Sequence, residues 1–331
     1  MPPTVSVIMS VYNGDRFLRT AIDSVLAQTF GDWELIVIDD ASTDSTPDIL
    51  ATYRDPRIRI LRNERNSKQA VCLNRAIAAA SGRYIACLDA DDVSLPDRLA
   101  VQVSYLETHP DVTLVASAAH FIDEGGSRFD FRAGGLGSCM ANFMFTWICP
   151  VIHSSNVFRA EAARPPNGYN EDPRYWWTDD YEFMSRIAFH GRAHVLPEPL
   201  VEYRIHASSV SGKNRKEQLL QHDLIVSANI KRATGVEVDD LTLQAWKRFR
   251  ETKAGAAVRF ESDEVKRLSV LIPGLLRGFK HDPYGPCVLP WYWAKHALVL
   301  AILRRGRISI GERARFLALA LKIAMYKLIW H

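Results

Sequence analysis

The chain reads YIACLDADD at residues 84–92. A short, mostly apolar run followed at once by aspartates is typical of a strand that is buried on both faces and ends at a group of carboxylates. Asp89 and Asp91 are alternate residues, so in an extended segment their side chains point the same way. A solvated turn would explain the same aspartates, but their place directly after a buried strand favours a ligand site.

Strand and helix patterns alternate on either side of this segment. Apolar runs predict strands at 5–11, 33–38, 58–61, 84–88 and 112–119. Helical spacing or a leading proline predicts helices at 15–29, 47–53 and 69–80 and after Pro96. This alternation predicts a Rossmann-like α/β fold with a mostly parallel central sheet, whose ligands bind beyond the carboxyl ends of the strands. No GxGxxG follows the first strand, which argues against a dinucleotide-binding dehydrogenase.

The second half of the chain is less regular. Five glycines between residues 125 and 137 predict an irregular segment over 125–150, and residues 165–170 read as a loop. Residues 179–190 read as a helix, and the chain from about residue 216 onward is helical. We therefore expect an α/β domain over 1–212 and a helical C-terminal extension over 213–331.

Composition and charge are those of a globular protein. Of 331 residues, 47% are hydrophobic and 24% are charged. The net charge of +3 is uneven, because residues 288–331 hold eight Lys/Arg against one acid and the rest of the chain is mildly acidic. The five cysteines form no CxxC pair, and the N-terminus reads as a strand rather than a signal peptide. We therefore expect reduced thiols and a cytoplasmic protein.

The basic extension favours a membrane surface as partner. No uncharged run in 288–331 reaches the ~18–20 residues that span a bilayer. Apolar stretches interrupted by Arg and Lys are typical of amphipathic helices that lie on an anionic membrane. A helical subdomain packed on the rest of the chain, or in a dimer, would explain the same pattern. The extension is more apolar than a nucleic-acid-binding tail, so no nucleic-acid partner is expected.

Two further acidic segments carry possible chemistry. Asp39 ends the second predicted strand, where a carboxylate either caps the next helix or accepts a hydrogen bond from a nucleobase or ribose. Asp179 and Asp180 open the predicted helix 179–190, where the helix dipole stabilises negative charge. Tryptophans at 176–177 would reduce solvation there and tune one carboxylate as a general base.

Taken in order, these segments resemble the family 2 inverting glycosyltransferases, which have the GT-A fold. The matching segments are residues 5–13, 24–30, 39–44, 88–99, 178–183 and 203–211. They extend over residues 4–211, nearly two-thirds of the chain. Two departures stand out: Asp179-Asp180 replaces a Glu-Asp pair, and Lys68 stands where the family often has glycine.

The resemblance implies a role for each motif. It places these residues around a nucleotide-sugar donor: Val11, Tyr12, Asn13, Asp39, Lys68, Asp89 and Ala90. Asp39 would contact the base, and Lys68 would approach a phosphate or simply stay solvated. Asp91 and Asp89 would hold Mn²⁺ or Mg²⁺, which prefer oxygen ligands. His206 lies where some relatives bring a metal or phosphate contact, although a lone histidine is also explained as an ordinary core or surface residue.

The resemblance also implies the reaction. Asp180 would be the general base, and His153, Trp177 and Asp179 would shape the acceptor side, although two tryptophans are also explained as core. A sugar would move from a nucleotide-diphosphate donor, by default a UDP-sugar, to a hydroxyl of a glycan or lipid-linked acceptor in cell-surface polysaccharide synthesis. The basic extension places this work at the inner face of the cell membrane, as a peripheral protein.

Two other functions are compatible with a sheet edged by acids. A nucleotidyltransferase usually carries a Gly-rich, basic loop after its first strand, whereas residues 11–15 here read VYNGD. A non-catalytic sugar- or membrane-binding protein would have no need of Asp89, Asp91 and Asp180. The sequence leaves open the sugar, the nucleotide, the acceptor, the linkage and whether the protein forms a homo-oligomer.

Overall fold

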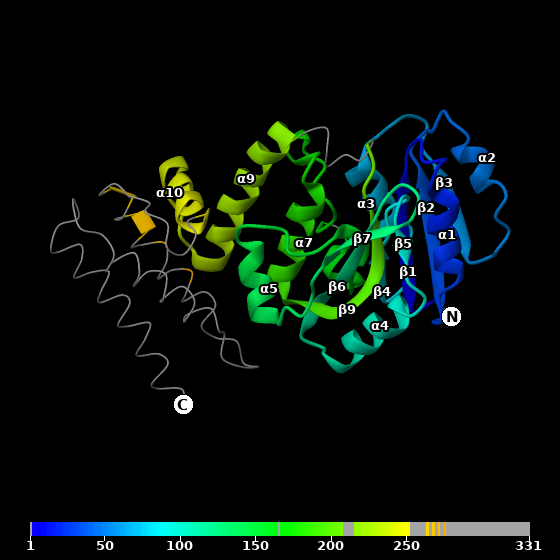
Figure 1. Cartoon of the computed structure of the whole chain (residues 1–331), viewed down its shortest axis with the longest axis horizontal. Coiled ribbons are helices and arrows are strands. Elements are labelled where there is room, and N and C mark those ends of the chain that lie inside the picture. The colour runs from blue at the N-terminus through cyan, green and yellow to red at the C-terminus, as the bar shows by residue number, and fades with distance from the viewer. Residues whose placement is uncertain are drawn as a thin grey trace. The chain divides into compact units, whose positions relative to one another are not determined.

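The computed structural model describes residues 2–164, 166–207 and 215–251, together with a few positions between 263 and 275. The chain divides into two compact units, Met1–His222 and Asp223–His331. The predicted boundary after residue 212 stays a prediction, and the basic extension over 288–331 lies outside the described residues. In the first unit the predicted α/β fold is confirmed (Figure 1).

One sheet of nine strands organises the first unit. Its order is β3 (Ile58–Arg62), β2 (Trp33–Asp39), β1 (Val5–Val11), β4 (Tyr84–Cys87), β8 (Val157–Arg159), β6 (Val112–Ile122), β9 (Arg192–Arg204) and β5 (Val93–Ser94), with β7 (Arg128–Arg132) paired to β6. The first four strands of this order are parallel, and so are β6 and β9. β8 is antiparallel to both of its neighbours, β4 and β6, and therefore joins the two parallel halves.

The helices predicted between the strands of the first half, and the helix predicted at 179–190, are present, and others occur that the sequence analysis did not predict. They are α1 (Leu18–Leu26), α2 (Thr46–Leu50), α3 (Gln69–Ala79), α4 (Arg98–Thr108), α5 (Ser138–Phe145), α6 (Ala160–Ala163), α7 (Asp179–His190), and the 3-10 turns η1 (His153–Ser155) and η2 (Pro173–Tyr175). Farther along lie α9 (Arg215–Thr234) and α10 (Asp240–Glu251). The irregular segment expected over 125–150 is wrong in part, because β7 and α5 form there and the glycines at 134–137 occupy only the turn between them.

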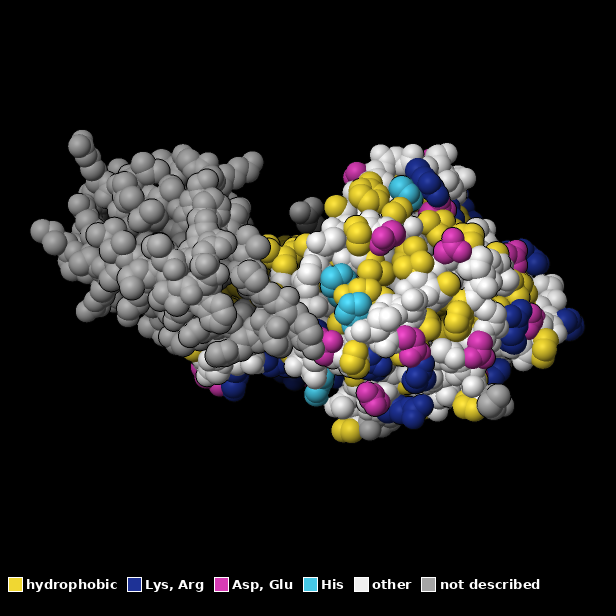
Figure 2. Space-filling view, turned by 90° about the horizontal axis from the view of Figure 1, so that it is seen from below, with side chains coloured by type: hydrophobic (Ala, Val, Ile, Leu, Met, Phe, Trp, Pro, Cys, Tyr) yellow, Lys and Arg dark blue, Asp and Glu magenta, His cyan; other side chains and the backbone are white. Residues whose placement is uncertain are grey.

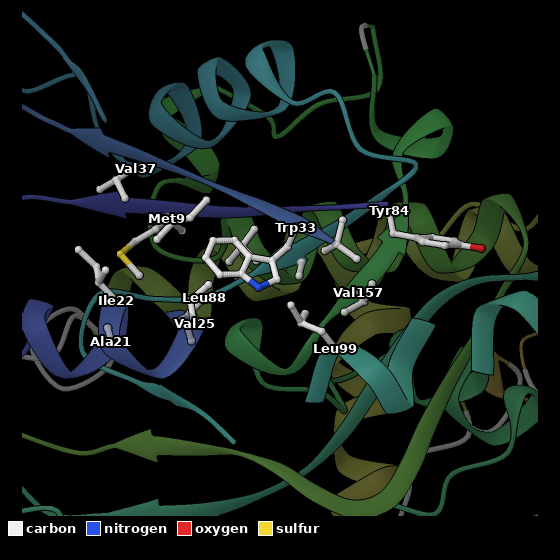
Figure 3. Packing of buried hydrophobic residues seen from close by; sticks show 14 of the residues in the cluster. Met9, Ala21, Ile22, Val25, Trp33, Val37, Tyr84, Leu88, Leu99 and Val157 are labelled. Atoms are coloured by element: carbon white, nitrogen blue, oxygen red, sulfur yellow. The ribbon is translucent and has the colours of Figure 1, made fainter. Parts of the chain in front are cut away.

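The hydrophobic core explains why β1 and β2 read as continuous apolar runs. Both strands are buried along nearly their whole length, since helices cover the two faces of the sheet. Figure 3 shows Trp33 of β2 packed among Met9, Val25 and Leu99, which come from β1, α1 and α4. Burial of each such side chain contributes about 1.5–3 kcal/mol. The core therefore fixes the sheet whose edge carries the site.

The strand register brings three loops to one edge of the sheet. Val11 is the β1 partner of Asp39 in β2, and Ile8 of β1 is the partner of Cys87 in β4. The loops that follow these strands therefore start side by side. Asn13, Ala41 and Lys68 adopt left-handed backbone angles, with φ of 52°, 61° and 77°. Such angles are uncommon for residues other than glycine and concentrate at functional sites.

On the face seen in Figure 2, Lys and Arg side chains are interspersed with Asp and Glu rather than gathered by sign. No helix within the described ranges is long and apolar enough to cross a membrane. Cys72, Cys87 and Cys149 are free thiols.

Candidate functional site

The loops after β1 and β2 are tied together by hydrogen bonds. The Asn13 amide N–H donates to Ser42 Oγ at 2.9 Å, and the Thr43 N–H donates to Asn13 Oδ1 at 2.8 Å. The Asp40 N–H donates to the Val11 carbonyl at 2.8 Å. Tyr12 is the first residue of the loop after β1 and is half exposed. The structure thus gathers Val11, Tyr12 and Asn13 beside the end of β2, as their predicted common role requires.

Asp39 is buried at the end of β2 and has a cationic neighbour. Its Oδ1 accepts the Ser42 N–H at 2.9 Å, and its Oδ2 lies 3.3 Å from Arg62 Nε. Arg62 also donates to the Ser42 carbonyl at 3.0 Å, although more than half of its side chain is exposed. No sequence motif singles out Arg62, which reaches this place from β3 only because β3 pairs with β2.

Asp40 holds the loop that carries Lys68. Its carboxylate accepts the backbone N–H groups of Ser67 and Lys68 at 2.8 and 2.9 Å, and the Asn63 side-chain amide at 2.7 Å. Lys68 is the N-cap residue directly before α3, and its ammonium lies 5.9 Å from the ring centroid of Trp176. Asp40 is therefore an organiser of the loop, a role that the sequence motif does not reveal.

The acidic turn after β4 holds its three carboxylates in different ways. Asp89 Oδ1 lies 2.8 Å from His153 Nδ1, and Asp91 Oδ2 lies 2.8 Å from His206 Nε2. These two side chains are 27% and 34% exposed. Asp92 is buried and accepts the Arg204 N–H at 2.8 Å as well as the Ser154 hydroxyl. Asp89 and Asp91 are therefore accessible to a ligand, whereas Asp92 is structural.

The electrostatics of this turn favour a cation. Burial raises the pKa of Asp91, and the neighbouring Asp89 charge adds to the rise. Burial together with the charges of Asp91 and Asp89 raises the pKa of Asp92 well above its usual range. For Asp89 burial acts in the same direction, but His153, Ser154 and Arg98 together outweigh it and lower the pKa. Carboxylates that raise each other's pKa in this way are stabilised when positive charge is added.

The carboxylates of this turn fit a hard divalent cation that takes its remaining ligands from a substrate. Asp91 and Asp89 offer carboxylate oxygens, the ligands that Mg²⁺ and Mn²⁺ prefer. The described residues contain no group of three or more His, Cys, Asp or Glu side chains that could hold a metal by themselves. One or two carboxylates completed by phosphate oxygens and water is the usual way in which Mg²⁺ is held beside a phosphorylated substrate.

The acidic pair at the start of α7 forms the other side of the site. Asp180 Oδ1 accepts the Tyr181 N–H at 2.7 Å, and Asp179 Oδ1 accepts the Asp180 N–H at 3.1 Å. Burial and the Asp180 charge raise the pKa of Asp179 to about 8. Burial also raises the pKa of Asp180, against an opposing effect of His153. A carboxylate with a raised pKa accepts a proton more readily, which suits a general base.

The remaining predicted residues lie around this core. His206 packs its ring 5.0 Å from that of Phe17, and Ala90 stands between the two accessible aspartates. His153 is buried beside the acidic turn, and its Nε2 lies 2.8 Å from the Tyr169 hydroxyl. The Trp177 N–H donates to Gln221 Oε1 at 2.9 Å. The predicted acceptor roles of His153, Trp177 and Asp179, and the metal role of His206, stay predictions.

Comparison with known proteins identifies the family of the chain. The family model described as glycosyl transferase family 2 matches residues 6–164. EpsE of Bacillus subtilis, a glycosyltransferase by name, is 36% identical over 217 residues, which cover 64% of this chain and 76% of EpsE. WfaP of Escherichia coli is 29% identical over 231 residues, which cover 69% of this chain and 87% of WfaP. It is named as a UDP-Glc:α-D-GlcNAc-diphosphoundecaprenol β-1,3-glucosyltransferase.

A solved structure has the same fold. S. aureus TarS 1-349, in complex with UDP-GlcNAc, matches with a TM-score of 0.60 at 14% sequence identity. The match covers 99% of this chain and 92% of TarS. At this identity the likeness supports the fold alone.

Asp179→Asn should change how stability depends on pH. The pKa of Asp179 rises from 3.8 to about 8 on folding, so between these values the native state binds a proton that the unfolded chain has lost. Stability of the wild type therefore falls as pH rises through this window, by up to about 1.4 kcal/mol per pH unit. Asparagine does not titrate, so we expect a smaller fall in melting temperature between about pH 5.5 and about pH 7.5. The matched control is Asp48→Asn at an exposed position, and identical pH profiles for wild type and Asp179→Asn would contradict the prediction.

Proposed function

The chain belongs to glycosyl transferase family 2, and on this premise we propose that it is an inverting, metal-dependent glycosyltransferase that uses a UDP-sugar. The resemblance drawn from the motifs is confirmed at the level of family and fold. One observation carries the proposal. Asp89 and Asp91, which are accessible, lie at the same edge of the sheet as Asp39 and the loop that holds Tyr12. Family membership leaves the nucleotidyltransferase alternative without support.

The donor would bind across the three loops. Asp39, with Arg62 beside it, offers an acceptor and a donor to the edge of a base, and Tyr12 offers an exposed ring to its face. UDP is favoured as the nucleotide because WfaP and its E. coli relative WfgD, 42% identical over 102 residues that cover 31% of this chain, both carry UDP-Glc in their names. Lys68, directly before α3, is bound through its backbone N–H to Asp40 of the loop after β2, where its side chain would meet a phosphate.

Asp91 would hold the divalent cation, with Asp89 near the ribose and the cation. Their carboxylates fit Mn²⁺ or Mg²⁺, and the diphosphate would complete the coordination. When bound, the cation supplies positive charge that offsets the charge developing on the departing diphosphate. His206 holds one oxygen of Asp91 and so orients the carboxylate toward the ligand.

Asp180 would carry the proton transfer. It accepts the proton of an acceptor hydroxyl as that oxygen attacks the anomeric carbon of the donor sugar. The bond from that carbon to the diphosphate oxygen breaks, and the nucleoside diphosphate leaves with the electron pair. Attack from the side opposite to the leaving group inverts the anomeric configuration, so an α-linked donor gives a β-glycoside. The raised pKa of Asp180, caused by burial, supports this role.

The acceptor and the location are proposed from relatives and sequence. WfgD and WfaP are named for a lipid-linked diphosphoundecaprenol acceptor, and TuaG of B. subtilis, 43% identical over 31% of this chain, is named for teichuronic acid biosynthesis. A lipid-linked acceptor suits a protein bound to the inner face of a membrane through basic residues 288–331. Trp177 and Asp179 are the proposed acceptor-side residues in this reading.

Asp180→Asn should abolish most transfer while leaving donor binding intact. Asparagine has nearly the same shape but cannot take up the proton, so turnover should fall about 10²–10⁴-fold. Turnover is measured as release of UDP from a panel of UDP-sugars, and donor affinity by calorimetry. Asp48→Asn serves as the matched control. Wild-type turnover in the Asp180 variant would show that another group is the base.

Asp91→Asn should raise the metal concentration that the reaction needs. Loss of a ligating charge should increase the Mn²⁺ concentration for half-maximal turnover by more than about 10-fold. Wild-type turnover should also vanish on chelation with EDTA and return with added Mn²⁺ or Mg²⁺. Full activity in EDTA, or an unchanged Mn²⁺ requirement in the variant, would rule out a metal at Asp91.

Replacing Arg304, Arg305 and Arg307 together by glutamine should weaken membrane association. Each basic residue near an anionic surface contributes about 1 kcal/mol, so vesicle binding of the full chain should fall about 100-fold. The measurement is co-sedimentation with phosphatidylglycerol vesicles, with neutral phosphatidylcholine vesicles as control. Absence of wild-type binding to the anionic vesicles would refute the membrane proposal and would leave the catalytic proposal unaffected.

A further inference from the structure

Two consecutive residues of η1 hold Asp89 by both its backbone and its side chain. Ser154 Oγ accepts the Asp89 N–H at 3.0 Å, and His153 Nδ1 lies 2.8 Å from Asp89 Oδ1. Both residues are buried, with 6% of His153 exposed and none of Ser154. An ionised carboxylate only accepts hydrogen bonds, so Nδ1 carries the proton of this contact. One oxygen of Asp89 is therefore committed to the ring, and the other is expected to meet a ligand.

The imidazole is held from its other end by Tyr169. The Tyr169 hydroxyl lies 2.8 Å from His153 Nε2. In a protonated ring Nε2 donates to the Tyr169 oxygen, and in a neutral ring with Nδ1 protonated it accepts the Tyr169 O–H. Both ring nitrogens are thus occupied. A rotation of the ring would break two buried hydrogen bonds at once, which fixes its direction.

Tyr169 is itself anchored to two helices. Its ring stacks on Phe183 of α7 with centroids 3.8 Å apart and planes inclined by 14°. Its backbone N–H donates to Asn74 Oδ1 of α3 at 2.6 Å, and its carbonyl accepts from Asn74 Nδ2 at 2.9 Å. Arg186 of α7 donates to the carbonyls of Asn167 and Gly168 just before it. The loop that presents Tyr169 is therefore attached to helices on both sides.

We propose that His153 is a positioning residue that sets the direction of the Asp89 carboxylate toward the donor, with Tyr169 as its support. The inference rests on the proposed function, because it assigns Asp89 to the donor. It differs from direct contact with an acceptor, since the ring is buried and both of its nitrogens are occupied. His206 makes the equivalent contact to Asp91, so each accessible aspartate of the turn has one oxygen fixed by a histidine.

The fixation matters because the three carboxylates repel one another. Asp89 lies close enough to Asp91 and Asp92 for its charge to raise the pKa of both. Without the bond to His153, Asp89 would turn away from these neighbours rather than keep one orientation. A carboxylate whose direction varies binds less tightly and less specifically than one held in place.

The test compares two substitutions of the same residue. The Asn amide nitrogen occupies the bonded position of Nδ1, so His153→Asn keeps a donor for Asp89 and loses the contact to Tyr169. The Gln amide nitrogen occupies that of Nε2, so His153→Gln keeps the contact to Tyr169 and loses the donor. For UDP binding measured by calorimetry with Mn²⁺, and for donor KM, we expect a weakening of about 10–100-fold in His153→Gln. Both values should stay within about threefold of wild type in His153→Asn, at similar melting temperatures of the two variants.

Tyr169→Phe gives a second measurement that leaves the histidine in place. It removes only the hydroxyl that supports the ring and should weaken UDP binding by a smaller factor, about threefold to tenfold. Equal UDP affinity and donor KM in the Asn and Gln variants would overturn the positioning role. If neither of them folds, unchanged UDP binding in Tyr169→Phe overturns it and weakened binding supports it. Absence of UDP binding and transfer in the wild type would instead refute the proposed function itself.

Discussion

Three carboxylates within four residues repel one another at the end of β4, and much of the site is built to hold them. Asp92 is buried and takes a backbone N–H from Arg204 and a hydroxyl from Ser154. Asp89 and Asp91 remain accessible, each with one oxygen on a histidine. Beneath them Arg98 is fully buried and donates to the carbonyls of Cys87 and Asn156. Like charges held together at such a cost in free energy are typical of a site that receives a cation with its ligand.

The groups that hold the acids come from distant parts of the chain. His153 and Ser154 reach the turn because β8, which follows them, pairs with β4 in antiparallel fashion. Arg204 and His206 reach it at the end of β9, which pairs in parallel with β6. Strand pairing therefore places residues from the second half of the chain at the sheet edge formed by the ends of β1, β2 and β4. This arrangement links Asp89 and Asp91, on the proposed donor side, with the proposed base Asp180, because the charges of Asp89 and His153 act on Asp180.

The local patterns predicted the first half of the fold and the second half less well. Continuous apolar runs identified β1, β2 and β4, because strands buried on both faces leave a clear signal. β8 has only three residues, too few for periodicity, and its antiparallel place between β4 and β6 depends on long-range pairing. The glycines at 134–137 suggested a long irregular segment, although β7 and α5 form on either side of them.

The accessible aspartates were predicted from their position after a strand. The contact of His153 with Asp89 could not be, since 64 residues separate them and no motif connects them. Arg62 and Asp40 were missed for the same reason.

The central claim is that the edge formed by β1, β2 and β4 binds a nucleoside diphosphate together with a divalent cation at the acidic turn. Crystals of the protein grown with UDP and Mn²⁺, measured at the manganese absorption edge, test it directly. The anomalous difference map should show one strong peak between the diphosphate and the Asp91 carboxylate, with the base beside Asp39. A manganese peak elsewhere, or UDP bound away from the ends of these strands, would contradict it.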